Sequence, residues 1–503
     1  MNQPAEPSVT DRPSASWSQR LWEPCDVASV AFFRVAFAGI MLWHVYFYCR
    51  YDLIERFFVA SPHHLSYFGF EWVKPLDGSG MRMVYYLMGL AAVGLGLGLF
   101  YRFCCVLFFL TFTYTFLAEA ALYQNHYYLI SLLAFLLILI PAHRSFSLDA
   151  VIFPARASKF VPNWCRWLLM FQIAVPHVYG GFAKLNSDWL HAMPVGMWVA
   201  NEGHLPIIGP YLTERWAHWV ISYAGLLLDL SLVPLLLWRR TRLLAYFAAV
   251  VFHLLNSVLF SIDVFPWFMI LATLIFFPAH WPRRFLRRLK PPVPAYQGTA
   301  RRSLSLTQRV GAGVVAMFVL WQMVFPFRHV LYPGNPGWTE EGRLFAWRMM
   351  LCRKDTFIRF YATDGVTKKT YEVPIARLFN LRQLIEIAIS PDQIVAITPF
   401  LAERARTGLR EVEIRAVAIT SLNGRKPQLM IDPNFDLTTV DRRLGHQPWI
   451  VPLTEPLRTE PWDVPSNAWP EVLGIELPAV QPQPALQGSR AASSGSSPPS
   501  PSQ

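Results

Sequence analysis

The sequence predicts a polytopic α-helical membrane protein with about eight or nine transmembrane helices and a C-terminal extramembrane α+β domain. Of its 503 residues, 53% are hydrophobic and 16% are charged, whereas soluble proteins carry about 25% charged residues. Long apolar runs fill the chain to about residue 330, and short alternating runs with turn signals follow from about residue 355. We therefore expect a polar N-terminal tail (1–27), a helical membrane domain that carries the candidate site (28–330), an extracytoplasmic α+β domain (331–460) and a Pro/Ser-rich, largely disordered tail (461–503).

Nine apolar segments are candidate membrane spans. They cover residues 28–48, 81–100, 103–122, 126–141, 164–184, 218–238, 243–260, 264–277 and 308–327. Several are shorter than the ~20 residues that a helix needs to cross a bilayer, so eight spans are as defensible as nine. The fifth segment carries Gln172, Pro176 and His177. A segment this polar is tolerated only where it faces other helices or a cavity.

The basic residues predict the orientation of these spans. The net charge is +12, and many Lys and Arg residues lie in short runs between apolar segments, including Arg239, Arg240 and Arg242, and Arg283, Arg284, Arg287, Arg288 and Lys290. Such runs are typical of cytoplasmic loops, so we do not expect a nucleic-acid partner. We therefore expect a cytoplasmic N-terminus and an extracytoplasmic C-terminal domain, in a protein of the bacterial inner membrane. This orientation places His126 and Lys184 at the same outer face.

The C-terminal domain shows the pattern of two β-hairpins separated by helices. Residues 356–363 and 370–374 are β-like and joined through Asp364-Gly365, a strong turn signal. Two amphipathic helical stretches follow at 375–389 and 391–406. The runs 411–422 and 428–431 then alternate around a second turn, Asn423-Gly424.

Lys184 is the ionisable residue that the chain places most conspicuously. It ends a long apolar segment within GGFAKLNSDW (180–189), and an ionisable side chain there indicates a functional site. Two alternatives remain open: the lysine could reach to the membrane surface as an anchor, or pair with Asp188 four residues later. We expect Asn186 and Ser187 to end the helix and turn Asp188 away.

Several short motifs occur in a fixed order along residues 28–457. They are NHYYL (125–129), AKL with DW (183–185 and 188–189), GLLLDL (225–230), FH with NS (252–253 and 256–257), LFSI (259–262), Gln322 with Pro326 and His329, and Trp347 with Met349 and Met350. In this order they resemble the vitamin K-dependent gamma-glutamyl carboxylases and their bacterial relatives, which carry a horizontally transferred transmembrane domain. The region that recognises the protein substrate is shorter here than in the family.

The resemblance implies roles for individual residues. Lys184 matches the second lysine of the family's paired-lysine motif, the base that deprotonates vitamin K hydroquinone, whereas Ala183 replaces the first lysine. Asn125 and His126 match the residues at the quinone and oxygen chemistry. The residues expected to line the quinone pocket are His253, Asn256, Trp189, Gln322 and His329.

The implied reaction is gamma-carboxylation of protein glutamate coupled to epoxidation of vitamin K hydroquinone with O2 and CO2. The expected partners are therefore the lipid membrane, a naphthoquinone and a glutamate-containing protein or peptide. Two alternatives remain: epoxidation of a vitamin K-type hydroquinone without peptide carboxylation, and a non-enzymatic quinone-binding or transport protein. A transporter should show inverted repeats with interrupted helices, and none is visible in the sequence.

The residue types suit this chemistry independently of the resemblance. Apolar surroundings disfavour the charged ammonium of Lys184 and so favour a neutral amine that accepts a proton. His126 could stabilise developing negative charge or simply hydrogen-bond at a helix start. His253 and Asn256 lie three residues apart, which also suits hydrogen bonding between helices, and Asp229 is interpreted as a paired structural carboxylate. No metal or nucleotide motif occurs, and we expect no metal.

Overall fold

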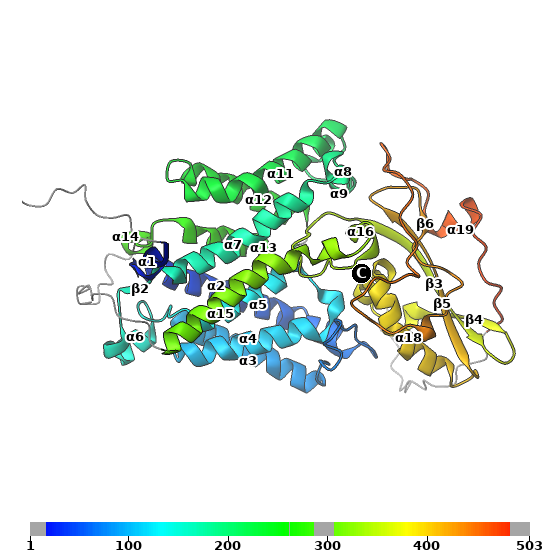
Figure 1. Cartoon of the computed structure of the whole chain (residues 1–503), viewed down its shortest axis with the longest axis horizontal. Helices are drawn as coiled ribbons and strands as arrows, with labels where there is room; N and C mark the ends of the chain where they lie inside the picture. The colour runs from blue at the N-terminus through cyan, green and yellow to red at the C-terminus, as the bar shows by residue number, and fades with distance from the viewer. Residues whose placement is uncertain (1–16, 261, 286–305, 483–503) are drawn as a thin grey trace, which may run out of the picture.

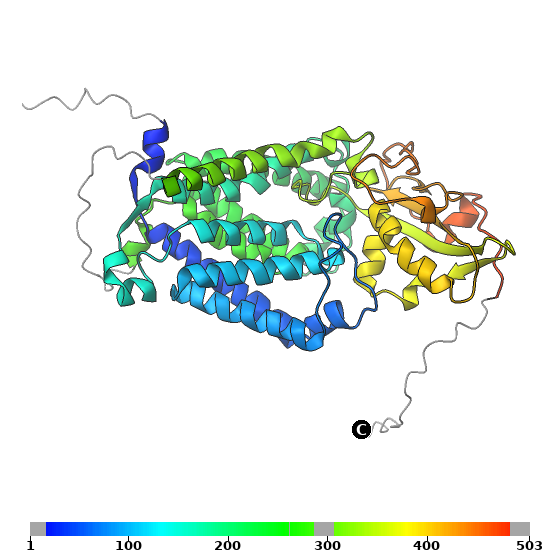
Figure 2. The same ribbon diagram turned by 60° about the horizontal axis from the view of Figure 1, so that its bottom comes forward.

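The computed structural model of the chain describes residues 17–260, 262–285 and 306–482. The molecule is elongated, with a helical bundle at one end and a sheet domain at the other (Figure 1). Helices α17 (Leu381–Ile389) and α18 (Pro391–Ala405) lie between the bundle and the strands in both ribbon views (Figure 2).

Each of the nine predicted membrane segments contains a helix. Within the described residues, six helices are long and apolar enough to cross a membrane. They are α2 (Ala28–Arg50), α3 (Gly78–Leu97), α4 (Tyr101–Ala118), α11 (Arg215–Leu237), α12 (Arg242–Leu259) and the span Arg309–Leu331, which joins most of α15 (Leu306–Val324) to the 3₁₀ helix η5 (Phe325–Leu331). The bent pair α17 and α18 also passes by composition, but these two helices pack on the sheet.

The count of six is lower than the eight or nine spans expected, for two physical reasons. The 15 residues of α5 (Asn125–Leu139) make a helix only about 22 Å long, and α13 (Phe265–Thr273) is also short, even with its 3₁₀ extension η4 (Leu274–Phe276). Helix α7 (Asn163–Lys184) is long enough at 22 residues, but its interior polar residues lower its hydropathy. Each of these three helices places several buried side chains in the interior of the bundle.

Helix α7 occupies the centre of the bundle and contacts α2, α5, α11 and α13. The chain packs in sequence on both sides of it, because α2, α3, α4 and α5 form one run of neighbours and α11, α12 and α13 another. Helix α12 lies at the edge of the bundle and turns Leu243, Leu244 and Phe247 outward, each 64–71% exposed. An outward apolar face of this kind fits contact with lipid.

The sheet domain is built on four antiparallel strands in the order β4-β3-β5-β6. They are β3 (Lys354–Asp364), β4 (Thr370–Val373), β5 (Val412–Leu422) and β6 (Gln428–Leu429). Both predicted hairpins are present, and pairing of β3 with β5 joins them into one sheet. The second turn needs left-handed backbone, with φ of 52° at Asn423 and 76° at Gly424, which these two residue types tolerate best.

Two of the predicted tails are shorter than expected. Part of the region assigned to a disordered tail from residue 461 packs on the sheet, where Trp469 is 3% exposed and lies against Tyr361 and Ile419. Apolar residues such as Trp462 and Trp469 supply the contacts that a Pro-rich composition concealed. The remainder, 483–503, lies outside the described residues.

The N-terminal tail is likewise only partly a tail. Residues 17–22 form helix α1 (Trp17–Trp22), and β1 (Pro24–Asp26) pairs with β2 (Phe160–Pro162). Residues 1–16 lie outside the described part.

Candidate active site

The end of α7 is defined by Asn186. The side-chain amide of Asn186 donates to the Ala183 carbonyl (2.8 Å), and its side-chain oxygen accepts from the Trp189 amide (3.0 Å), which starts the short helix α8 (Ser187–Leu190). Asp188 points away from Lys184 and accepts two hydrogen bonds from Arg425 (2.6 and 2.7 Å). The break therefore separates Asp188 from Lys184, as the Asn186-Ser187 pair predicts.

Lys184 pairs instead with Asp229 on α11. Its Nζ lies 2.5 Å from Asp229 Oδ2, and His177 Nδ1 lies 2.9 Å from Asp229 Oδ1. All three side chains are buried, with residue exposures of 5–6%. His177 and Lys184 are seven residues apart, so two turns of α7 place them on one face. A buried charge needs such a partner, because desolvation without one costs several kcal/mol.

The ammonium of Lys184 is also covered by an aromatic ring. Its Nζ lies 5.1 Å from the Trp189 ring centroid, a distance at which a cation is attracted to the ring face. Trp189 is fixed in turn, since its indole N–H donates to the Ser222 carbonyl (2.9 Å). Lys184 therefore lies inside the protein and does not reach to the membrane surface as an anchor.

A cavity of about 310 Å³ opens beside this ion pair. It brings together five of the residues singled out in the sequence, namely Lys184, Asn125, His126, His253 and Asn256. Its walls include Phe252, Phe265 and Met269, so apolar surface surrounds a few polar groups. This combination is typical of a site for a small organic molecule.

Several buried polar atoms on the cavity wall have no partner within the described chain. They are Gln124 Oε1, His126 Nε2, His177 Nε2 and both ring nitrogens of His253. A buried polar group without a hydrogen bond costs about 1–3 kcal/mol. The residues present therefore fit a ligand that carries hydrogen-bonding oxygens at more than one point.

Asn125 is held at the start of α5. Its side-chain oxygen accepts from the Tyr123 hydroxyl (3.0 Å), and the same hydroxyl accepts from the Phe345 amide (2.7 Å). Because its oxygen is engaged, Asn125 has its amide N–H groups to offer to a ligand. The His126 ring lies against Phe265, with centroids 5.4 Å apart, which fixes its position on the wall.

Three residues predicted for the pocket lie outside the cavity lining. Trp189 is close to Lys184 but covers it from the other side. Gln322 donates to the Tyr128 hydroxyl (3.1 Å), and His329 bonds to the Pro326 carbonyl through Nδ1 (2.9 Å). Gln322 lies near the end of α15 and His329 in η5. Neither lines this cavity, and their role at a quinone pocket stays a prediction.

Other lining residues were missed or given another role. The sequence analysis singles out His177 only for its polarity, although its spacing of seven residues from Lys184 predicts that the two side chains share one helix face. Asp229 was read correctly as paired, but its partner on another helix was not identified. Arg343 and Arg382 reach the cavity from the C-terminal half, and no sequence pattern connected them with the membrane helices.

No group of three His, Cys, Asp or Glu side chains in the described residues is arranged to hold a metal ion. The polar groups on the cavity wall include the ion pair and the imidazole and amide groups around it.

Two models of known protein families match the chain. The HTTM domain model matches residues 22–281, which is more than half of the chain, and the model of the vitamin K-dependent gamma-carboxylase lumenal domain matches residues 307–456. The chain belongs to the vitamin K-dependent gamma-carboxylase family. The cavity of this gamma-carboxylase relative draws its lining from both matched regions, with Lys184 in the first and Met349 in the second. No solved structure matches the chain significantly.

Proposed function

We propose that this protein oxidises a reduced naphthoquinone of the vitamin K hydroquinone type with O2, and couples this oxidation to gamma-carboxylation of protein glutamate with CO2. The observation that carries the proposal is the buried Lys184–Asp229–His177 cluster on the wall of a largely apolar cavity. When bound, the hydroquinone supplies the reducing equivalents for O2 and, through its oxidation, the strong base that removes a proton from the glutamate γ-carbon.

Lys184 is the proposed base for the hydroquinone hydroxyl. As a neutral amine, Lys184 would accept the hydroxyl proton at Nζ, while His177 holds Asp229 in place through its own contact with Oδ1 (2.9 Å). The ammonium formed then remains 2.5 Å from Asp229, so the carboxylate stabilises the product of the transfer.

The remaining lining residues orient the substrate and exclude water. Asn125 and His126 offer N–H groups on one wall, and His253 offers ring nitrogens on another. Hydrogen-bond donors fixed in advance stabilise negative charge as it develops on an oxygen. The apolar side chains between them keep water from the strong base.

The test is product analysis of purified wild type and Lys184→Ala with vitamin K hydroquinone, O2, labelled bicarbonate and a glutamate-containing peptide. Wild type should form the epoxide and labelled peptide, and Lys184→Ala should lose both by at least ~100-fold, the usual contribution of a general base. Lys368→Ala is the matched control, because this lysine is exposed on the sheet domain and forms a surface ion pair with Glu413.

The outcomes separate the alternatives. Epoxide without label in the peptide would select a hydroquinone epoxidase. Neither product from wild type would point to a quinone-binding or transport protein. Undiminished epoxidation by Lys184→Ala would remove Lys184 from the mechanism.

A further inference from the structure

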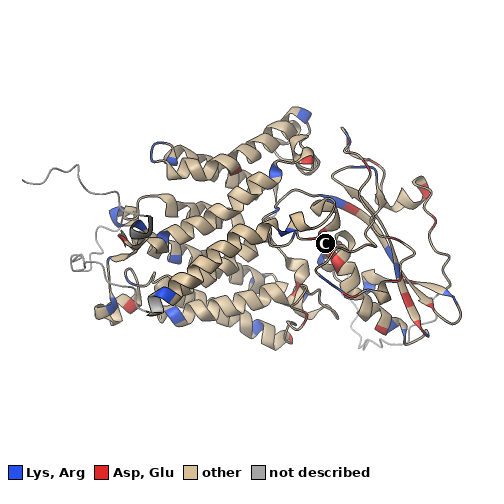
Figure 3. Cartoon of the chain, in the orientation of Figure 1, with Lys and Arg blue, Asp and Glu red and all other residues tan. Residues whose placement is uncertain are grey.

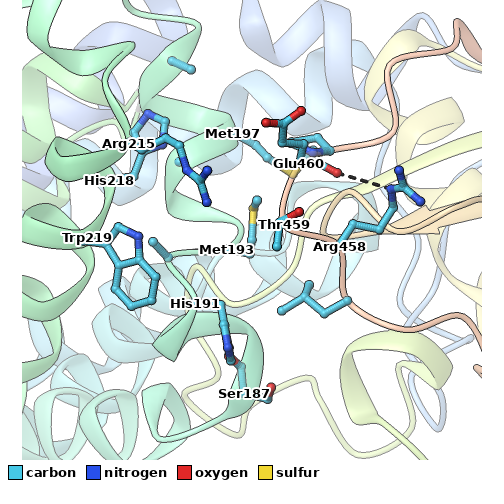
Figure 4. Close-up of a pocket in the computed structure, with 15 residues that line it drawn as sticks. Ser187, His191, Met193, Met197, Arg215, His218, Trp219, Arg458, Thr459 and Glu460 are labelled. Carbon is cyan, nitrogen blue, oxygen red and sulfur yellow. Dashed lines mark hydrogen bonds between the residues drawn. The ribbon is translucent and has the colours of Figure 1, made fainter.

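A second, larger cavity lies on the other side of α8. We call it the outer groove; its volume is about 600 Å³. One wall comes from α8, from α9 (Val195–Ala200) and from the start of α11, and the other comes from the segment 457–461 (Figure 4). Ser187 at the start of α8 lines the outer groove, whereas Lys184, three residues earlier, lines the cavity proposed to bind the quinone, which we call the quinone cavity. The two sites therefore lie on either side of the break between α7 and α8.

The groove is rich in basic groups. Arg215 and Arg458 lie on opposite walls, and His191 and His218 add two imidazoles, whereas Glu460 is the one carboxylate among its lining residues (Figure 4). The Arg215 guanidinium has no carboxylate partner within the described chain. Arg458 donates to the backbone oxygen of Glu460 (3.3 Å) and is not neutralised by this contact. The lining thus offers two arginines to an anionic ligand.

Both walls are attached to the sheet domain by hydrogen bonds. The Trp462 amide donates to the Gly424 carbonyl (2.9 Å), which holds the segment 457–461 in place. On the opposite wall, Arg353 donates to the Met197 carbonyl (3.2 Å). The groove is therefore a fixed part of the junction between the two domains.

The groove lies partly inside and partly outside the matched regions. Its first wall falls within the HTTM match, which covers residues 22–281. The lumenal-domain match ends at residue 456, and the wall formed by 457–461 follows immediately after it. Neither family match covers this second wall.

We propose that the outer groove docks an acidic polypeptide segment next to the glutamate that is carboxylated. This proposal rests on the proposed function. Arginine binds carboxylates through two parallel hydrogen bonds, and two arginines on opposite walls suit a ligand that carries carboxylates at several points. Met193 and Met197 provide apolar surface for the rest of the peptide, and methionine adapts its shape to varied sequences.

The first test measures binding without turnover. Full-length protein in phosphatidylcholine nanodiscs is titrated against a fluorescein-labelled peptide rich in glutamate, and Kd is read from anisotropy. The Arg215→Gln/Arg458→Gln variant should raise Kd by about tenfold, equivalent to the loss of ~1.4 kcal/mol, and replacing glutamate by glutamine in the peptide should have the same effect on wild type. Lys184→Ala should bind the acidic peptide as wild type does, which separates docking from the proposed chemistry.

The matched control is Arg406→Gln/Arg410→Gln, which removes the same net charge from exposed positions after α18. An equal rise in Kd in this control would show that only net charge matters and would overturn the proposal. The proposal would also fail if the groove variant bound like wild type. Loss of wild-type peptide binding on adding phosphatidylglycerol to the nanodisc, without such loss in the groove variant, would assign the groove to lipid headgroups instead.

Discussion

Asp229 gives Lys184 its position and its partner. A single carboxylate contacts two basic side chains of α7, one through each oxygen. The sequence shows Asp229 only as a carboxylate within an apolar run, because its partner lies 45 residues earlier on another helix. Contacts between helices depend on packing that local periodicity does not encode.

Asp229→Asn is predicted to act mainly on kcat for hydroquinone oxidation. Removing one member of a buried ion pair leaves the other charge uncompensated, at a cost of ~3–5 kcal/mol in stability, and Lys184 loses the group that orients it. We expect kcat to fall by ~100-fold with little change in KM for the hydroquinone, measured by epoxide formation at a temperature where the variant remains folded.

Asp149→Asn is the control for that variant. Asp149 accepts hydrogen bonds from the Phe100 and Tyr101 amides (both 2.9 Å) and does not line the cavity beside Lys184. The Asp149→Asn variant should have a lower unfolding temperature and an unchanged kcat. A rise in KM with unchanged kcat in Asp229→Asn would contradict the positioning role.

At the scale of elements, the turn Asn423-Gly424 joins the sheet to the membrane domain. Asn423 Nδ2 donates to Asp188 Oδ2 (2.8 Å), alongside the Arg425 guanidinium. The sequence predicts the turn itself, since Asn-Gly between alternating runs is a hairpin signal. It does not predict that the turn docks on α8, because no local pattern relates residues 188 and 423.

Gly424→Ala is predicted to destabilise this junction. Gly424 has φ of 76°, and an added Cβ would lie 3.0 Å from Pro461 Cα. We expect a loss of at least ~1 kcal/mol from backbone strain, seen as a lower unfolding temperature and faster proteolytic release of the sheet domain.

Gly408→Ala is the matched substitution, because no atom lies within 4 Å of the corresponding Cβ position. It should leave both readouts close to wild type. If Gly424→Ala were equally neutral, the turn would not be a constrained part of the junction.

For the whole molecule, the architecture was largely predictable and the placement of its parts was not. Apolar runs located the membrane helices and turn signals located the hairpins, because both patterns are local. His126 and Lys184 were expected at one depth, and both line one cavity. Gln322 and His329 do not line that cavity, and no local pattern shows which wall the end of α15 joins.

The distribution of charge predicts the orientation in the membrane. Lys and Arg gather at the end of the bundle remote from the sheet domain (Figure 3), which would be the cytoplasmic end. A reporter that is active only in the cytoplasm should therefore give a signal when fused before Met1 and none when fused after Gln503. Full signal from the C-terminal fusion would reverse the orientation.

The central position of α7 has a consequence for biogenesis. During synthesis, Lys184 and His177 emerge from the ribosome before Asp229, their carboxylate partner in the finished bundle. A lone α7 would expose these polar side chains to lipid, which is costly. We therefore expect α7 to settle in the bilayer only once α11 packs beside it.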